Sequence, residues 1–195
     1  MPKQLIKEKM ILNERDTRHE HILQVARQIM TAARTAPKGK GIDIVEIALI
    51  TDDEIKQLSD KMIAMVEEHG MKFFLRDADN ILQAECVILI GTREQAQGLN
   101  CGYCGFPSCA ERVKGVSCGL NSIDLGIAVG SACATAADLR VDTRVMFSAG
   151  LAAQRLNWLK DCTKVLALPV SASSKNPFFD RKSKQVLQAQ RIGGE

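Results

Sequence analysis

The chain has 195 residues, of which 46% are hydrophobic and 25% charged, and its formal net charge is +3. This length and composition suit one globular domain, which we expect over residues 1–195, with a core that needs no disulfide bonds. The first residues, MPKQLIKEKM, contain no apolar stretch, and the uncharged run 125–137 is too short to span a bilayer. The sequence therefore argues against secretion and membrane insertion and predicts a cytoplasmic protein.

Basic residues outnumber acidic ones in residues 1–40 and 141–195, whereas Asp and Glu are in excess in residues 41–99. The two basic parts are able to form one face that attracts anions. Nucleic acid is one such anion, but the chain has few aromatic side chains for base stacking and no recognisable nucleic-acid-binding motif. We do not expect nucleic acid to be a partner.

The first predicted element is an amphipathic helix over residues 17–33, with Asp16 or Thr17 as its N-cap. Apolar residues recur in it at helical spacing: Ile22, Val25, Ile29 and Met30. The loop 34–41, with one proline and two glycines, ends this helix, and the β-branched run 42–50 predicts a buried strand.

A second helix is predicted over residues 52–69. Thr51 and Glu54 have the spacing of a capping box, and Gly70 is the expected C′ residue. Residues 71–83 lack a firm period and are interpreted as a short helix.

Residues 85–91 predict a second buried strand, and the composition then changes to Gly, Cys and turn residues over 92–120. The remaining predicted elements are a helix over 121–139, a strand over 143–148, a helix over 150–159, a strand over 163–169 and a polar loop over 171–181. The tail from Lys182 is expected to be loose or to dock on a partner.

Four of the seven cysteines fall within the segment 92–120, with the spacing Cys101-x2-Cys104-x4-Cys109-x8-Cys118. Glycine and proline between them let the chain turn tightly enough for the four thiolates to converge. Four cysteine thiolates are the ligand set of iron–sulfur clusters. The spacing therefore predicts one cluster, of the 4Fe-4S type, shielded from water by Tyr103, Phe106 and Val116.

A structural zinc site with four cysteines and unmetallated redox thiols are the alternatives for these residues. The zinc reading is weaker because zinc sites usually have two similar pairs, whereas eight residues separate the second pair here. Of the other three cysteines, Cys86 lies in a predicted strand, Cys133 in a predicted apolar helix and Cys162 just before a predicted strand, and each is expected to be a small buried residue.

The run from Cys101 to Cys109, CGYCGFPSC, resembles the small 4Fe-4S module of electron-transfer subunits, although the fourth cysteine comes sooner here. This module, followed by DLGIAVGS from Asp124, RVMFSAG from Arg144 and LPVSASSKNPFFDR from Leu168, resembles the DUF2148 family of ferredoxin-domain proteins. The resemblance covers most of residues 20–181. It implies a 4Fe-4S cluster.

The loop sequence ARTAPKGKG from Ala33 also resembles the Ala-Pro-Ser loop of FMN-dependent nitroreductases, with Lys38 in place of the serine. This resemblance implies an α+β fold with a mixed β-sheet flanked by helices, a homodimer, and FMN at its interface. It makes Arg34, Lys38 and Lys40 candidate contacts to the flavin phosphate. A solvated basic loop is the alternative.

Several other residues have an ordinary structural interpretation. Arg144 and Arg181 are expected to join the anion site or to pair with Asp142 and Asp180, respectively. The glycines at positions 126 and 130 are expected to permit close helix packing. The sequence contains no P-loop and no metalloprotease or hydrolase motif.

The sequence thus predicts an iron–sulfur redox protein that exchanges electrons with a partner protein, either as a flavin-linked oxidoreductase or as an electron-transfer protein. The alternative hypothesis is non-enzymatic: a structural or sensing metal in a protein that recruits a partner.

Overall fold

The computed structural model describes residues 11–179. In chain order its elements are α1 (Glu14–Thr35), the short 3-10 helix η1 (Gly39–Gly41), β1 (Val45–Ile50), α2 (Asp52–His69), α3 (Phe73–Ile81), β2 (Cys86–Arg93), α4 (Gly119–Asp138), β3 (Asp142–Thr143), α5 (Phe147–Arg155) and β4 (Cys162–Ser171). The predicted α+β class is confirmed. The N-terminal tail before residue 11 and the C-terminal residues from 180 lie outside the described residues.

The four strands form one sheet in the order β1-β2-β4-β3. Every pairing is antiparallel, whereas a mixed sheet was expected, so that part of the prediction is wrong. β2 lies in the centre, paired with β1 on one side and with β4 on the other. The short β3 pairs only with Ser171 and Val170 of β4, and the isolated bridge between Met146 and Ala167 extends this contact.

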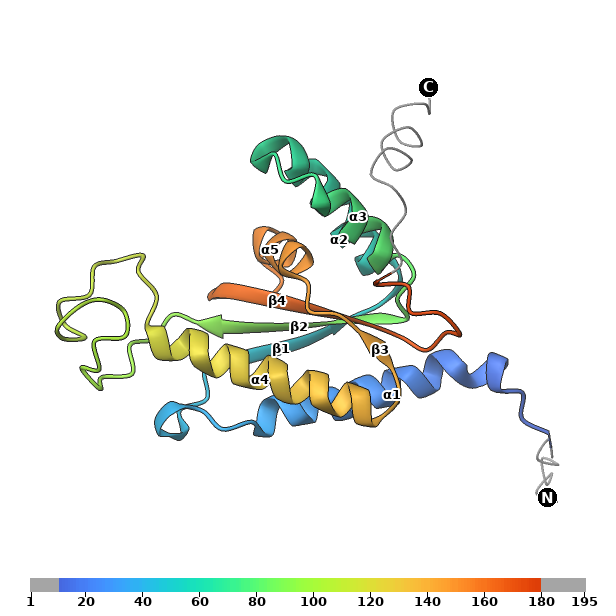
Figure 1. Cartoon of the computed structure of the whole chain (residues 1–195), viewed down its shortest axis with the longest axis horizontal. Helices are drawn as coiled ribbons and strands as arrows, with labels where there is room; N and C mark the ends of the chain where they lie inside the picture. Colours follow the sequence, from blue (N-terminus) through green and yellow to red (C-terminus); the bar gives the residue numbers. More distant parts are fainter. Residues whose placement is uncertain (1–10, 180–195) are drawn as a thin grey trace, which may run out of the picture.

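Helices cover both faces of the sheet, with α1 and α4 on one face and α2, α3 and α5 on the other (Figure 1). The central strand β2 serves both layers because its side chains alternate. Cys86, Ile88 and Ile90 join the core under α1 and α4, whereas Val87 and Leu89 join the core under the other three helices. All five are 0% exposed, which explains why this strand reads as an unbroken apolar run.

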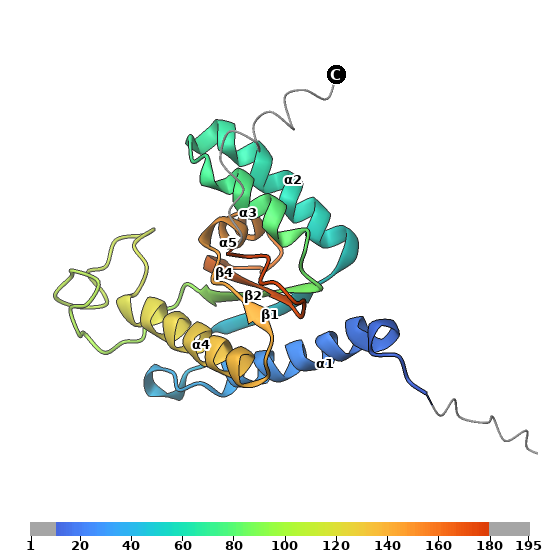
Figure 2. The ribbon, with the colours of Figure 1, turned by 45° about the vertical axis from the view of Figure 1, so that its right-hand side comes forward.

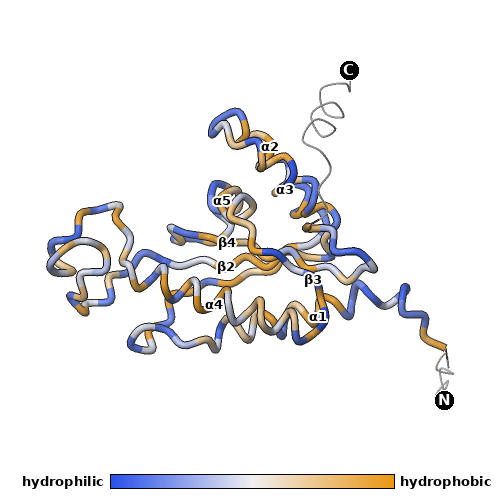
Figure 3. The backbone as a smooth tube through the Cα atoms, in the orientation of Figure 1, coloured by the Kyte–Doolittle hydropathy of each residue, from blue (hydrophilic) through white to orange (hydrophobic). Residues whose placement is uncertain are grey.

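The hydropathy of the chain follows these layers (Figure 3). The strands at the centre are mostly hydrophobic, and hydrophilic residues lie along the outer helix faces and in the loops. α4 has the length and hydropathy of a membrane-spanning helix by composition alone. In this fold one side of α4 packs on α1, where Ser131 Oγ donates to Ala32 O at 3.0 Å, so this composition belongs to a helix of the core layer.

The predicted strand over 143–148 is wrong beyond its first residues. Only Met146 continues the pairing, and Phe147 already begins α5. The reason lies at Gly150, where a Cβ atom would lie 2.2 Å from Val165 O. The missing side chain lets a helix lie directly on the backbone of β4, a contact that a local propensity does not reveal.

Two predicted helix caps also differ from the structure. Asn13 caps α1 by accepting the backbone N–H of Arg15, so the helix begins three residues before Thr17. Thr51 lies at the N-cap of α2 but makes no side-chain capping bond. Gly70 has the expected left-handed conformation, with φ 66°, at the end of α2.

Candidate metal centre

The four predicted ligands lie in a long connection between β2 and α4, which we call the cysteine segment (residues 94–118). It projects from one end of the fold as an extended loop in both views (Figures 1 and 2). Its two ends meet: Asn121 Nδ2 donates to Arg93 O at 3.2 Å, and the N–H of Cys118 points to Glu94 Oε1 at 3.4 Å. The segment is therefore anchored at a single base.

Left-handed backbone positions shape the segment. Asn100 has φ 48°, and Gly102, Gly105 and Gly115 have φ values of 73°, 84° and 92°. Glycine adopts this region without a steric penalty, and asparagine tolerates it better than most residues. The predicted role of these glycines in tight turns is confirmed.

Asn100 connects two parts of the segment to each other. Its side-chain Oδ1 accepts the N–H of Cys109 at 2.8 Å, and its own N–H points to Cys109 Sγ at 3.4 Å. Asn100 is followed directly by Cys101, so this double contact draws Cys101 towards Cys109. An N–H aimed at a cysteine sulfur is also the contact that stabilises a metal-bound thiolate.

A second contact involves Gly119 at the start of α4. A Cβ atom there would lie 2.9 Å from Tyr103 Cβ and 3.0 Å from Tyr103 O. Only glycine allows this approach, which brings the chain before Cys104 against the turn that follows Cys118. Cys118 is buried and is the N-cap residue of α4.

Two contacts thus link neighbours of the cysteines: Asn100, next to Cys101, contacts Cys109, and Tyr103, next to Cys104, contacts Gly119, next to Cys118. Within residues 11–179, no three His, Cys, Asp or Glu side chains lie close enough to form a metal-binding group. The donor set nevertheless fits an iron–sulfur cluster: four free thiols lie on a single loop, and one already faces a backbone N–H. The same set also fits zinc.

The remaining three cysteines differ in environment. Burial raises the pKa of Cys86 to about 12 and that of Cys162 to about 11, and it also raises the pKa of Cys133. Cys86 and Cys162 are buried in the core, as predicted, and Cys133 is half-buried. Raised thiol pKa values and burial make these three residues poor ligands and weak nucleophiles.

Buried polar side chains gather at the base of the cysteine segment. Arg112 donates to Glu94 Oε1 at 2.5 Å and also to Val116 O. Gln97 Nε2 donates to Asn121 Oδ1 at 3.3 Å. In the described part of the chain, six buried side-chain atoms lack a hydrogen-bond partner, and four of them belong to this base: Glu94 Oε2, Gln97 Oε1, Arg112 Nε and Asp124 Oδ2.

The three cations proposed as flavin-phosphate contacts all have internal partners. Arg34 donates to Asp43 Oδ2 at 2.7 Å and to Val45 O at 2.6 Å. Lys38 donates to Arg34 O and, at 3.0 Å, to Ala33 O, so it caps the end of α1. Lys40 donates to Gln97 O at 3.1 Å. The basic loop is therefore held in place by its own charged groups.

Charge effects follow from these contacts. Burial lowers the pKa of Lys38, because a partly desolvated ammonium is less stable than a hydrated one. Burial alone would raise the pKa of Asp43, but the hydrogen bonds from Arg34 and from the N–H of Val45 outweigh it and lower that pKa. Arg34 and Asp43 are both about 40% exposed, so solvent screens much of their attraction.

Two buried polar residues at this base were not expected from the sequence. Asp124 Oδ1 accepts the N–H of Gly39 at 2.9 Å, and Gln97 joins Lys40 to Asn121. The one signal that could have identified Asp124 is a lone acidic residue within an apolar helix. Nothing in the local pattern distinguishes Gln97.

Other expectations for single residues need correction. Arg144 pairs with Asp77 at 3.4 Å, not with Asp142, which accepts from Asn176 instead. Tyr103 is 70% exposed and does not shield the segment, whereas Phe106 and Val116 are half-buried. The glycines at 126 and 130 meet nothing within 4 Å, so they do not serve close helix packing. Arg181 and Asp180 lie outside the described residues.

Solved structures with a similar fold include a flavoprotein and a nitroreductase with bound FMN, both of low sequence identity to this chain. A BluB-like flavoprotein from Clostridium difficile 630 has a TM-score of 0.55 and 14% identity, over 93% of this chain and 90% of that one. A nitroreductase with bound FMN from Desulfitobacterium hafniense has a TM-score of 0.54 and 15% identity, over 83% and 84%. The nitroreductase-like fold is thus confirmed.

Sequence comparison identifies the family. A family model described as an uncharacterised protein containing a ferredoxin domain, DUF2148, matches residues 114–181, which include Cys118 but not the other three cysteines of the segment. An uncharacterised protein of Archaeoglobus fulgidus is 40% identical over 186 residues, covering 90% of this chain and all of its own. The chain belongs to the DUF2148 family of proteins that contain a ferredoxin domain.

Proposed function

We propose that this protein is an iron–sulfur redox protein in which Cys101, Cys104, Cys109 and Cys118 hold one 4Fe-4S cluster. The observation that carries the proposal is the cysteine segment itself, with four free thiols on one projecting loop and an N–H facing Cys109 Sγ. The ferredoxin domain in the description of the family supports a redox or electron-transfer role. When bound, such a cluster accepts and releases one electron at a time.

The chain's own residues would control the environment of the bound group. The N–H of Asn100 stabilises negative charge on Cys109 Sγ. Cys118 lies at the N-terminus of the 20-residue helix α4, whose positive end favours a thiolate over a thiol. The pair of Arg112 and Glu94 fixes the loop next to Cys118.

The test begins with anaerobic purification and measurement of iron, sulfide, zinc and flavin on the same sample, with the visible spectrum. We expect broad absorbance at about 400 nm and about four iron and four sulfide per chain. Cys104→Ala should abolish both. Cys133→Ala is the matched control, because this half-buried thiol lies outside the segment.

Two results would reject the cluster. Unchanged iron content in Cys104→Ala would exclude this residue as a ligand. Stoichiometric zinc in a colourless protein would instead support the alternative proposal of a non-enzymatic protein, in which a structural or sensing metal orders residues 92–120 for a partner.

A flavin-linked oxidoreductase is the finer form of the redox proposal. The solved neighbours with bound FMN support it, and Arg34, Lys38 and Lys40 remain the proposed phosphate contacts. Each would have to exchange an internal hydrogen bond for the phosphate. Lys40 is exposed, so Lys40→Gln should weaken FMN binding in a fluorescence titration, whereas Lys72→Gln, an exposed control, should not.

We also propose a redox partner protein, a homodimer and a cytoplasmic location. The dimer is supported by the outer face of α4, where Ile123 is 43% and Ile127 is 41% exposed. Sedimentation equilibrium should give twice the chain mass for the wild type and a lower mass for Ile127→Lys. A monomeric wild type would reject the dimer without affecting the cluster proposal.

A further inference from the structure

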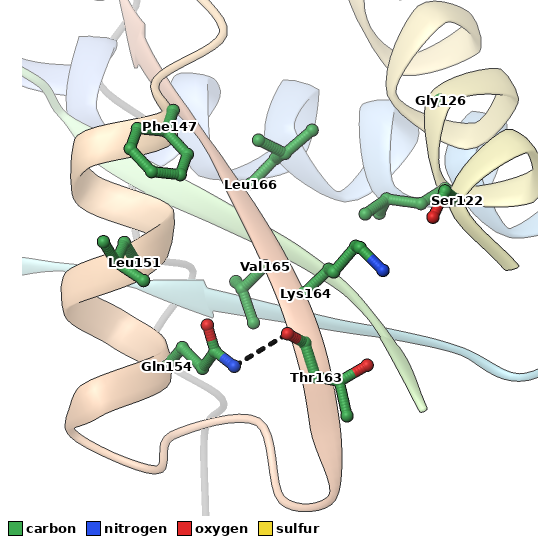
Figure 4. A pocket seen from close by; sticks show the side chains of 10 residues that line it. Ser122, Gly126, Phe147, Leu151, Gln154, Thr163, Lys164, Val165 and Leu166 are labelled. Carbon is green, nitrogen blue, oxygen red and sulfur yellow. Dashed lines mark hydrogen bonds between the residues drawn. The ribbon is translucent and has the colours of Figure 1, made fainter. Parts of the chain in front are cut away.

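A cavity of about 450 Å³ opens at the free edge of β4 (Figure 4). β3 and the Met146 bridge cover β4 only from Ala167 onwards. Among the described residues, no strand pairs with this side of residues 162–166. The cavity lies along this edge, between the first turns of α4 and the outer side of α5.

The residues that line the cavity lie on both sides of β4. Val165 faces the core under α5, and on that side Phe147 and Leu151 line the cavity. Leu166 packs towards the core under α4, and on that side Leu125, Ser122 and Gly126 line the cavity. The cavity thus has apolar walls on both sides of the strand, with Phe147, which is 51% exposed, as its aromatic surface.

Lys164 is the charged residue in this lining. It makes no ion pair with any residue among 11–179. Gln154 is already occupied, because its Nε2 donates to Thr163 O at 2.8 Å. A volume in this range with apolar walls and few polar groups is typical of a small-molecule site. A lining that contains one cation, Lys164, and one aromatic ring, Phe147, suits a planar aromatic compound that carries one negative charge.

The position of the cavity indicates which aromatic compounds are relevant. Ser122 follows Cys118 by four residues on the same helix, a rise of about 6 Å along its axis. A bound molecule would therefore lie one helical turn from the proposed cluster ligand. We infer that this cavity binds a planar, redox-active aromatic compound with one anionic substituent, of the quinone sulfonate or quinone carboxylate class. The redox character rests on the proposed function, whereas the binding does not.

Gly126 gives a selective way to test this site. A Cβ atom at Gly126 would meet nothing within 4 Å, and the residue lines the cavity, so a larger side chain there would enter it. Leucine is also a better helix former than glycine, so Gly126→Leu should fold. Gly130→Leu is the matched control, because Gly130 is equally open, lies one turn further along α4 and is absent from the lining.

The experiment is calorimetric titration with 9,10-anthraquinone-2-sulfonate, which is planar, anionic and unreactive towards thiols, and with uncharged 2-(hydroxymethyl)anthraquinone. We expect one site per chain for both probes, and Gly126→Leu should weaken both by about 100-fold while Gly130→Leu changes neither. Lys164→Gln should weaken only the sulfonate, by about fivefold.

Equal binding by Gly126→Leu and the wild type would overturn the site, and so would a wild type that binds neither probe. The molecular mass of each variant is also measured by sedimentation equilibrium. The proposal is also overturned if the wild type is a dimer that binds no probe and Gly126→Leu is a monomer. That result would show that the cavity is a contact between two copies of the chain. Titrations repeated on Cys104→Ala separate the two claims, since loss of the cluster should leave probe binding intact.

Discussion

Asp124 Oδ1 accepts the backbone N–H of Gly39 at 2.9 Å, although the two residues are 85 positions apart in the sequence. Asp124 is 2% exposed, and this contact ties the basic loop to the helix that starts beside Cys118. Asp124→Ala would leave the Gly39 N–H without its partner and should lower the free energy of unfolding by about 1–3 kcal/mol. Urea denaturation measures this loss.

The control for that variant is Asp138→Ala, at the exposed last residue of the same helix. Removing an acid from a helix C-terminus should be neutral or slightly stabilising. Equal stability of the two variants would show that the bond to Gly39 contributes nothing.

The close contact of α5 with β4 gives a second prediction. Gly150→Ala would place a methyl group 2.2 Å from Val165 O, so the helix must move off the strand. We expect a loss of about 1–3 kcal/mol in the free energy of unfolding. Gly130→Ala has open space and should be neutral or stabilising by up to ~1 kcal/mol, because alanine is the better helix former. If both variants melt at the same temperature, the helix does not lie on the strand as described.

A third prediction concerns Asp77, which is 3% exposed. It accepts from Ser148 Oγ at 2.6 Å and pairs with Arg76 at 2.7 Å and with Arg144 at 3.4 Å. Asp77→Ala would leave both guanidinium groups without this carboxylate. The side chains of Arg76 and Arg144 are about one-quarter exposed. We therefore expect the free energy of unfolding to fall by about 3 kcal/mol, the lower end of the range for breaking a buried ion pair.

Arg144 also donates to Phe178 O at 3.0 Å and lies over the Phe179 ring at 5.7 Å. Asp77→Ala should therefore increase hydrogen exchange around Phe178, measured by mass spectrometry. Asp53→Ala, at an exposed position in the first turn of α2, is the control and should change exchange only locally. Unchanged hydrogen exchange at Phe178 in Asp77→Ala would show that the contact between Asp77 and Arg144 does not stabilise the segment around Phe178.

The buried thiol of Cys86 predicts how stability depends on alkaline pH. Its pKa is raised from 9.0 to about 12 by burial in the folded protein, whereas the unfolded chain ionises near the ordinary value. Because the folded pKa is the higher one, the stability contribution is complete below pH 9 and is lost as pH rises towards 12. At pH ~10.5 the loss should be about 2 kcal/mol.

Cys86→Val keeps the apolar volume and removes the titrating group. Urea denaturation of metal-free wild type and variant at pH ~7.5 and ~10.5 should show a smaller alkaline loss in the variant. Cys162 contributes a similar loss in both proteins, since its pKa is about 11. An equal alkaline loss in the two proteins would contradict the assignment to Cys86.

Most of the fold could be predicted from local pattern because the main elements bury one face each or lie wholly in the core. β2 is apolar on both faces, and α2 ends at Gly70 as expected. The region after α4 could not be predicted in the same way. A β-branched and aromatic run favours a strand locally, but the contact of Gly150 with Val165 O decides for a helix, and that contact joins two distant segments.

In the candidate site, too, some features follow from local sequence and others from contacts between distant segments. The spacing from Cys101 to Cys118 is local, so the sequence alone selects these residues, and their ligand role stays a prediction. Asp124 and Gln97 matter through partners far away in the chain, which a local pattern does not contain. The same is true of the internal partners of Arg34, Lys38 and Lys40.

The meeting of the two ends of the cysteine segment has a further consequence. Arg93 and Asn121 are joined by a hydrogen bond at 3.2 Å, so the chain leaves the sheet and returns to it at neighbouring points. The entropy of closing a loop rises only slowly with its length, by about 0.6 kcal/mol per doubling. A change in the length of this loop should therefore cost little in stability, because the junction between Arg93 and Asn121 keeps both ends of the loop at the core.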